Sequence, residues 1–141
     1  MPARIPAFSI FSAVSELFVT AGVVYVIARN WTRRAFPLGL FLVIAVFEAF
    51  VNVFYMATKS ARAAAGAETI STGMKIAFAA HGMLSLLAYL VFVVLGVIAW
   101  QEQRAGRYFF RERPGVTWTF AVVWAISVIS GEVMFALRYL R

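Results

Sequence analysis

Four long apolar segments dominate this sequence, and each is close to the length that crosses a lipid bilayer. They cover about residues 7–28, 37–57, 74–100 and 116–137, and the breaks between them are polar and basic. A bilayer core about 30 Å thick is spanned by ~20 apolar residues in a helix. Because lipid offers no partners for backbone polar groups, segments of this length are expected to be α-helical. We therefore predict an all-α, four-helix transmembrane bundle with both termini on the same side.

Composition supports this prediction and favours a single integral membrane domain over residues 1–141. Hydrophobic residues make up 63% of the chain and charged residues only 13%, too few to cover a water-exposed surface. The chain has no Cys, which excludes disulfides and thiolate metal sites. Its single His excludes a bis-histidine haem within one chain, although not a haem shared by two chains.

Charge suggests the orientation and the surroundings of the bundle. We name the side with both termini side A, and the side with loops 29–36 and 101–115 side B. Side B carries seven Lys or Arg residues and side A six, a bias that predicts side B in the cytoplasm and the termini outside it. The net charge of +7 points to anionic lipid headgroups as partners, and not to nucleic acid.

The N-terminal segment has some features of a signal sequence. Its apolar run is too long for that role, and no A-x-A cleavage site follows it before the arginines. We interpret it as a helix of the mature protein.

Each apolar segment contains an acid or an imidazole at a similar depth. These residues are Glu16, Glu48, His81 and Glu132, and Asn52 lies one helical turn from Glu48. Counted from side A, they lie at depths of roughly 7–14 Å, taking ~1.5 Å of rise per residue. Charged residues within a span are costly, and they tend to face the bundle interior or one another. We therefore predict that all five meet at one interior site.

More polar side chains fall on the same helical faces and are expected to surround this site. They are Ser12, Thr20, Tyr55, Ser85 and Tyr89. Small residues are expected to let the helices approach closely. Four glycines are the candidates: Gly22, Gly82, Gly96 and Gly131.

The charge of the predicted site requires compensation. Three ionised Glu and a neutral His carry −3, and no Lys or Arg lies at the same depth, although Lys75 or Arg138 could approach from side A. Protons are one solution, held by carboxyl groups that hydrogen-bond to one another, to Asn52 or to His81. A divalent metal is the other, because this oxygen-rich ligand set suits Zn, Mn or Fe better than haem. A ferritin-type di-iron site would need two Glu-x-x-His pairs, which the sequence lacks, so a single ion is favoured.

These alternatives lead to three hypotheses on function. The first is a metal site with redox or hydrolytic chemistry, or one that delivers metal to a respiratory complex. The second is a non-enzymatic subunit or assembly factor, in which the buried network only carries protons or fixes helix pairing. The third is a small proton-coupled transporter that works as a homo-oligomer, since four helices leave little room for a substrate path.

Three stretches of the chain resemble a known group of proteins. They are "FEAFVNVFYMATKS", "AAHGMLSLLAYLVF" and "VTWTFAVVWAISVISGEVMFALRYLR". Their texture is similar to that of small four-helix bacterial membrane proteins whose best-understood members assist assembly of haem–copper terminal oxidases. Members of that group use several histidines, whereas here only His81 matches, with Glu48 and Glu132 where further imidazoles would stand. The resemblance therefore implies the fold, a location in the bacterial inner membrane and, within the site, His81 alone.

Overall fold

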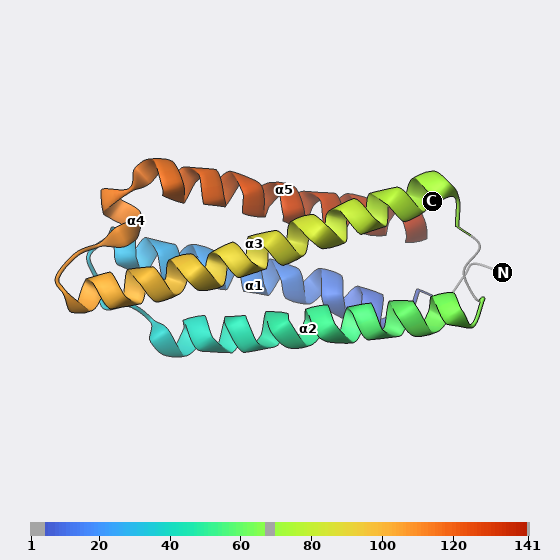
Figure 1. Ribbon diagram of the computed structural model, residues 1–141, viewed down its shortest axis with the longest axis horizontal. Coiled ribbons are helices and arrows are strands. Elements are labelled where there is room, and N and C mark those ends of the chain that lie inside the picture. Colours follow the sequence, from blue (N-terminus) through green and yellow to red (C-terminus); the bar gives the residue numbers. More distant parts are fainter. Residues whose placement is uncertain (1–4, 67–69, 141) are drawn as a thin grey trace.

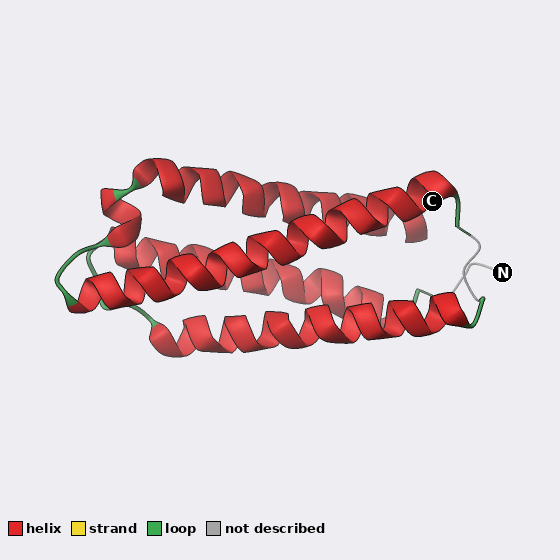
Figure 2. Cartoon of the chain, viewed as in Figure 1, coloured by secondary structure: helices red, strands yellow, loops and turns green. Residues whose placement is uncertain are grey.

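The computed structural model describes residues 5–66 and 70–140, and the regular structure within them is entirely helical (Figure 2). The four long helices are α1 (Ala7–Trp31), α2 (Leu38–Ala64), α3 (Thr72–Arg104) and α5 (Pro114–Tyr139). A single additional turn, α4 (Phe109–Glu112), precedes α5. The predicted all-α four-helix bundle is confirmed. The sequence did not predict α4, because one helical turn is too short to produce a hydropathy signal.

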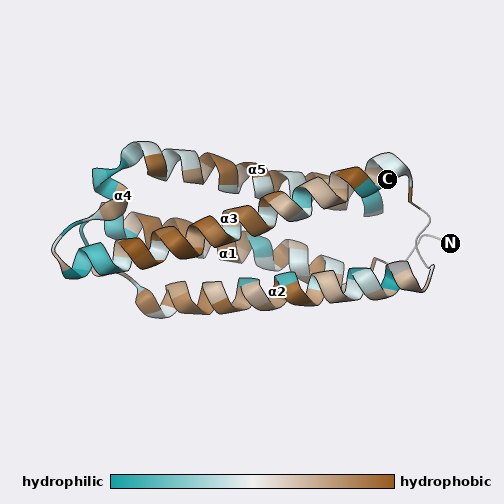
Figure 3. Ribbon diagram, viewed as in Figure 1, coloured by the Kyte–Doolittle hydropathy of each residue, from teal (hydrophilic) through white to brown (hydrophobic). Residues whose placement is uncertain are grey.

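The four long helices are each long and apolar enough to cross a membrane. At ~1.5 Å per residue, α1 with 25 residues is about 38 Å long and α3 with 33 residues about 50 Å. Large apolar side chains remain exposed around the bundle, among them Phe18 at 76% and Met83 at 75% exposure. Figure 3 shows this hydrophobic character along the helices and hydrophilic residues at the connections near α4. An apolar exterior of this extent indicates an integral membrane protein.

Helix α1 begins and α5 ends at the same end of the bundle, which is side A (Figure 1). The hydroxyl groups of Ser9 and Tyr139 lie 3.3 Å apart and join these two helix ends. Ser71 caps α3 by accepting a hydrogen bond from the backbone N–H of Met74. Pro114 begins α5, a position where its missing N–H costs nothing.

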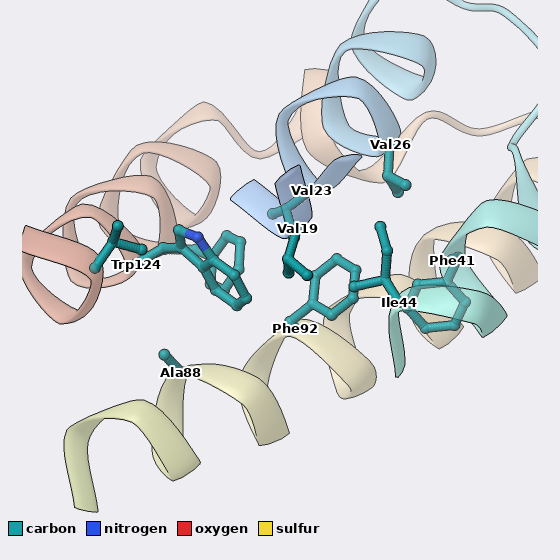
Figure 4. Packing of buried hydrophobic residues seen from close by; sticks show 10 residues of the cluster. Val19, Val23, Val26, Phe41, Ile44, Ala88, Phe92 and Trp124 are labelled. Atoms are coloured by element: carbon teal, nitrogen blue, oxygen red, sulfur yellow. The ribbon is translucent and has the colours of Figure 1, made fainter. Parts of the chain in front are cut away.

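The half of the bundle toward side B is tightly packed, and we call it the packed half. Its centre is the fully buried ring of Phe92 on α3, which lies among side chains of the other long helices (Figure 4). The ring centroid of Phe92 is 5.2 Å from that of Phe41 on α2 and 5.8 Å from that of Trp124 on α5. The buried residues of this cluster are Val19, Val23, Val26, Phe41, Ile44, Ala88, Phe92, Phe120, Trp124 and Val128.

Glycine allows the closest helix approach in the packed half. A Cβ atom at Gly96 would overlap the ring of Phe41, and one at Gly22 would lie 2.7 Å from Ile44 Cδ1. Gly131 is similarly close to His81. The predicted role of these three glycines is confirmed. It is wrong for Gly82, whose Cβ would meet nothing within 4 Å.

A buried amide closes the side B end. Asn30, at the end of α1, is fully buried. Its Oδ1 accepts a hydrogen bond from the backbone N–H of Phe110 at 3.0 Å, and its Nδ2 donates to Gln103 Oε1 at 3.1 Å. Nearby, Arg113 donates two hydrogen bonds to the carboxylate of Glu102. These contacts join α1, α3, α4 and the start of α5. The polar groups that they involve are hydrogen-bonded within the protein and do not need water as a partner.

Candidate functional site

The half of the bundle toward side A contains a cavity of about 830 Å³ that is lined by all four long helices. We call this half the cavity half. Its volume falls in the range of small-molecule binding sites, roughly 300–1,000 Å³. The lining includes all five predicted site residues and three of the expected surrounding ones: Glu16, Glu48, Asn52, His81 and Glu132, with Ser12, Tyr55 and Ser85. The structure therefore brings the polar groups of four separate helices to one place.

The cavity follows from how the helices pair. Helix α3 packs most extensively against α5, and α1 packs against α2. In Figure 1, α3 runs close to α5 toward side A and separates there from α2. In the packed half, Gly22 of α1 lies against Ile44 and Gly96 of α3 against Phe41, both on α2. Toward side A, polar side chains of all four long helices line the space between them.

His81 is held in one orientation by a serine on the neighbouring helix. Its Nδ1 lies 2.8 Å from Ser130 Oγ, and the Ser130 hydroxyl donates to the backbone carbonyl of Ser127 at 2.8 Å. A serine hydroxyl has one proton, so in this arrangement Nδ1 carries a proton and donates to Ser130. The other ring nitrogen, Nε2, is then left with a lone pair that can accept a proton.

Glu16 meets His81 at the backbone of Gly131. A Cβ atom built on Gly131 would lie 3.1 Å from His81 Nε2 and 3.4 Å from Glu16 Oε2. Both polar atoms therefore lie close to one point, although they come from α3 and α1. The bare backbone of Gly131 makes room for this approach.

The other two glutamates lie in different surroundings. Glu48 and Glu16 border a small inner recess beside Trp124, whose Nε1 donates a hydrogen bond to Thr20 at 3.1 Å. Glu132 has one carboxylate oxygen, Oε1, that is buried and has no hydrogen-bond partner within the part of the chain that is described. An orphaned buried oxygen is costly, so this carboxyl group has an unmet need for a donor.

Three predicted residues make contacts that differ from the expectation. Asn52 donates from Nδ2 to the backbone carbonyl of Glu48 in its own helix, at 2.8 Å, and not to another helix. Thr20 accepts from Trp124, and Tyr89 donates to the carbonyl of Ala45 at 3.0 Å. Thr20 and Tyr89 therefore join helices and do not line the cavity. Their i, i+4 spacing correctly predicted that they face the inside of the bundle. It did not show whether they reach the cavity or another helix.

Over residues 5–66 and 70–140, no Lys or Arg side chain lies within ion-pair distance of Glu16, Glu48 or Glu132. The ion pairs found there both involve Glu102, at the other end of the bundle. In the same ranges, no group of three or more His, Asp or Glu side chains is arranged to hold a metal ion. The ligand arrangement that the metal hypothesis requires is therefore not found among the described residues, and a bound metal stays a prediction.

Cations gather instead at the side A end of the cavity, which we call the mouth and define by Lys59, Arg62, Phe78 and Arg138. The cationic groups of Lys59 and Arg138 each lie 5.3 Å from the centroid of the Phe78 ring. Lys75, which the sequence suggested could approach the site, is not among the lining residues.

A second opening faces the membrane between α2 and α3, and we call it the lateral opening. It is lined by Val53, Met56, Met83 and Leu86. These side chains border the cavity and are also exposed on the outside of the bundle, Val53 by 71%. The apolar wall of the cavity therefore extends to the outer surface of the bundle between α2 and α3.

The chain matches no protein-family model, no curated protein and no solved structure. The resemblance to oxidase-assembly proteins stays a prediction, and the function is argued from the cavity. Sequence reasoning missed Ser130, which orients His81. Its only signal in the sequence was that of a polar side chain within an apolar segment, two residues before Glu132.

Proposed function

We propose that this protein binds a membrane-soluble organic cation in the cavity and releases protons as it does so. The observation that carries the proposal is that three glutamates line one largely apolar cavity with no Lys or Arg in ion-pair distance among the described residues. An ionised carboxylate in a low-dielectric environment needs a compensating charge. A proton or a cationic ligand can supply it, and the two compete for the same oxygens.

The lining of the cavity favours an organic ligand over a metal ion. Aromatic side chains line the cavity together with the acids, among them Phe8, Tyr55 and Phe135. Organic cations are recognised by the faces of aromatic rings together with a nearby negative charge. A metal ion would instead need several oxygen or nitrogen ligands converging on one point.

His81 gives the displaced proton a place to go. With Nδ1–H donated to Ser130, the Nε2 lone pair is free to accept the proton that leaves Glu16 when the ligand arrives. His81 lies one helical turn deeper than Phe78 of the mouth, so the proton can continue toward water at side A. Glu16, Glu48 and Glu132 hold the cation, and His81 moves the proton.

The two openings suit different species. Positive charges at the mouth repel a cationic ligand, whereas the lateral opening between α2 and α3 is apolar. A lipophilic cation dissolved in the bilayer therefore enters sideways, past Val53 and Met83. Protons leave at the mouth.

Isothermal titration of the detergent-purified protein with tetraphenylphosphonium tests this function. We expect binding that is stronger in mildly alkaline than in acidic buffer, because protons and the cation compete. Titrations in two buffers of different ionisation enthalpy should show proton release on binding. Glu16→Gln should weaken binding at least about tenfold, which is ~1.4 kcal/mol. Glu112→Gln is the matched control, because its carboxylate caps α4 at side B.

Two results would overturn the proposal. One is an absence of heat change with the wild-type protein, and the other is an affinity that does not depend on pH. Elemental analysis of the same sample adds a direct comparison with the metal hypothesis. Near-stoichiometric metal that disappears in His81→Ala would favour that hypothesis in place of ours.

A further inference from the structure

We infer that the small recess beside Trp124, which we call the inner recess, is a binding site for a single water molecule that links the carboxyl groups of Glu16 and Glu48. Glu16, Glu48 and Ser85 line both the cavity and the inner recess. Ser127 lines the inner recess but not the cavity. The water site therefore adjoins the proposed cation site and adds a hydroxyl group that the cation site does not use.

The inner recess has room for one water molecule and for nothing larger. A volume of about 10 Å³ is open to the centre of a water-sized molecule. One buried water needs ~10–15 Å³ by this measure. Three buried residues of the packed half form the apolar part of the wall: Ala88, Trp124 and Val128. Size alone therefore excludes an organic cation from this space.

Ser127 on α5 places a hydroxyl group at the inner recess without a partner from the described part of the chain. The residue is only 3% exposed. Its backbone carbonyl accepts a hydrogen bond from Ser130 Oγ, but no bond of the Ser127 hydroxyl group is found among residues 5–66 and 70–140. Trp124 already donates its N–H to Thr20. A buried hydroxyl group without a partner is costly, so a ligand that bonds to Ser127 is favoured.

The polar groups around the inner recess match the hydrogen-bonding capacity of water. A water molecule donates two hydrogen bonds and accepts two, and buried waters typically make about three in all. Glu16 on α1 and Glu48 on α2 offer carboxyl oxygens as acceptors. Ser85 on α3 and Ser127 on α5 offer hydroxyl protons as donors. One water molecule can therefore bond to all four long helices at once.

This set of groups favours water over a sodium ion of similar size. A cation would bind the hydroxyl oxygens and leave the hydroxyl protons in need of other acceptors. For Ser127, no bond to a backbone carbonyl or a carboxylate is found within the described ranges. A water molecule accepts that proton itself.

The water also gives the proton of Glu48 a route to His81, a role that rests on the proposed function. Glu16 Oε2 and His81 Nε2 lie close to one point beside Gly131. Glu48 shares the inner recess with Glu16. Once Glu16 has passed its own proton to Nε2 and that proton has left, Glu48 gives its proton to the water, and the water gives one of its protons to the Glu16 carboxylate. The water is unchanged by this step, and Ser127 acts as a positioning residue through it.

Crystal structures of the ligand-free protein, at a resolution that shows ordered water, test the site. We expect one peak of density in the inner recess of the wild-type protein, within hydrogen-bond distance of Ser127 Oγ and of both carboxyl groups. The peak should be equally strong in crystals grown with sodium chloride and with choline chloride. Ser127→Ala should lose the peak. Ser85→Ala should weaken it, which provides a result if Ser127→Ala does not fold.

Stopped-flow mixing with tetraphenylphosphonium and a pH indicator tests the relay. Ser127→Ala should release protons several times more slowly than the wild-type protein, at equal equilibrium affinity, because Ser127 does not line the cavity. Ser15→Ala is the matched control in both experiments, because Ser15 lines the cavity but not the inner recess. It should keep the peak of density and the wild-type rate.

Three crystallographic results would overturn the water site. They are an inner recess without density in the wild-type protein, a peak that persists unchanged in Ser127→Ala, and a peak seen only with sodium, which would make the ligand a sodium ion. Proton release that is as fast in Ser127→Ala as in the wild-type protein would overturn the relay. A wild-type protein that does not bind tetraphenylphosphonium would overturn the proposed function and the relay, while the density would still decide the water site.

Discussion

The packed half and the cavity half are built from the same four helices, yet they treat buried polar groups in opposite ways. In the packed half, the buried amide of Asn30 has partners on both its oxygen and its nitrogen, and the hydroxyl of Thr117 donates to the Phe110 carbonyl. In the cavity half, Glu132 Oε1 is buried without a hydrogen bond in the described part of the chain. Unpaired carboxyl groups lower stability, and paired amides do not.

This difference shows how the bundle can tolerate its acids. Close contacts around Phe92 and the hydrogen bonds of Asn30 stabilise the side B end. The side A end can then hold three glutamates and an open cavity, both of which cost stability. Proteins commonly depart from optimal packing at functional sites in this way. The comparison yields predictions that contrast matched residues in the two halves.

The largest expected contrast is between two glycines of α3. Gly96→Ala should lower the free energy of unfolding by about 3 kcal/mol, because the new methyl group overlaps the Phe41 ring. Gly82→Ala meets open space and should be neutral or stabilising by up to ~1 kcal/mol, since Ala favours helix. Thermal unfolding of both variants in detergent measures the difference. Equal destabilisation would mean that the cavity half is packed as tightly as the other.

Two asparagines provide the next contrast. Asn30→Leu should cost about 2 kcal/mol, because it removes the acceptor of the buried Phe110 N–H. Asn52→Leu should cost less than ~1 kcal/mol, since its amide donates only to a carbonyl of its own helix. Denaturation in a graded detergent mixture measures both. If Asn52→Leu lost more stability than Asn30→Leu, the conclusion that the packed half contributes most of the stability would be wrong.

Glu132→Gln should stabilise the protein by about 1 kcal/mol. Gln keeps the shape of Glu but removes the carboxyl oxygen that is buried without a partner among the described residues. Glu102→Gln should show the opposite sign, because Glu102 accepts two hydrogen bonds from Arg113. Thermal unfolding of the two variants in detergent measures both effects, and a loss of stability in Glu132→Gln would contradict this prediction.

The smallest expected effect concerns Ser130. Ser130→Ala should change stability by less than ~0.5 kcal/mol. It should weaken tetraphenylphosphonium binding about threefold. The reason is that His81 loses the hydrogen bond that keeps the proton on Nδ1 and the lone pair on Nε2. Ser15→Ala is the control, since Ser15 also lines the cavity but bonds only to the Ser12 carbonyl of its own helix. Titration calorimetry measures both variants, and identical affinities would remove Ser130 from the mechanism.

Part of the candidate site could be read from the sequence because helical rise is nearly constant. The depths of Glu16, Glu48, His81 and Glu132 follow from counting residues inward from the helix ends. Their common cavity agrees with that count. The hydrogen-bond partners of individual side chains could not be predicted from this count. Tyr89 reaches the Ala45 carbonyl and His81 reaches Ser130, because these contacts depend on how far each helix is rotated and displaced relative to its neighbours.

The sequence by itself determined that this chain forms four membrane-spanning helices with polar groups at one level. The physical reason is local: apolar segments of about 20 residues must satisfy their backbone within lipid, and only helices do so at that length. The tertiary structure alone decided which half is packed and which is hollow. That depends on the separation of α3 from α2 toward side A and on the contact of Gly96 with Phe41, and both arise between helices.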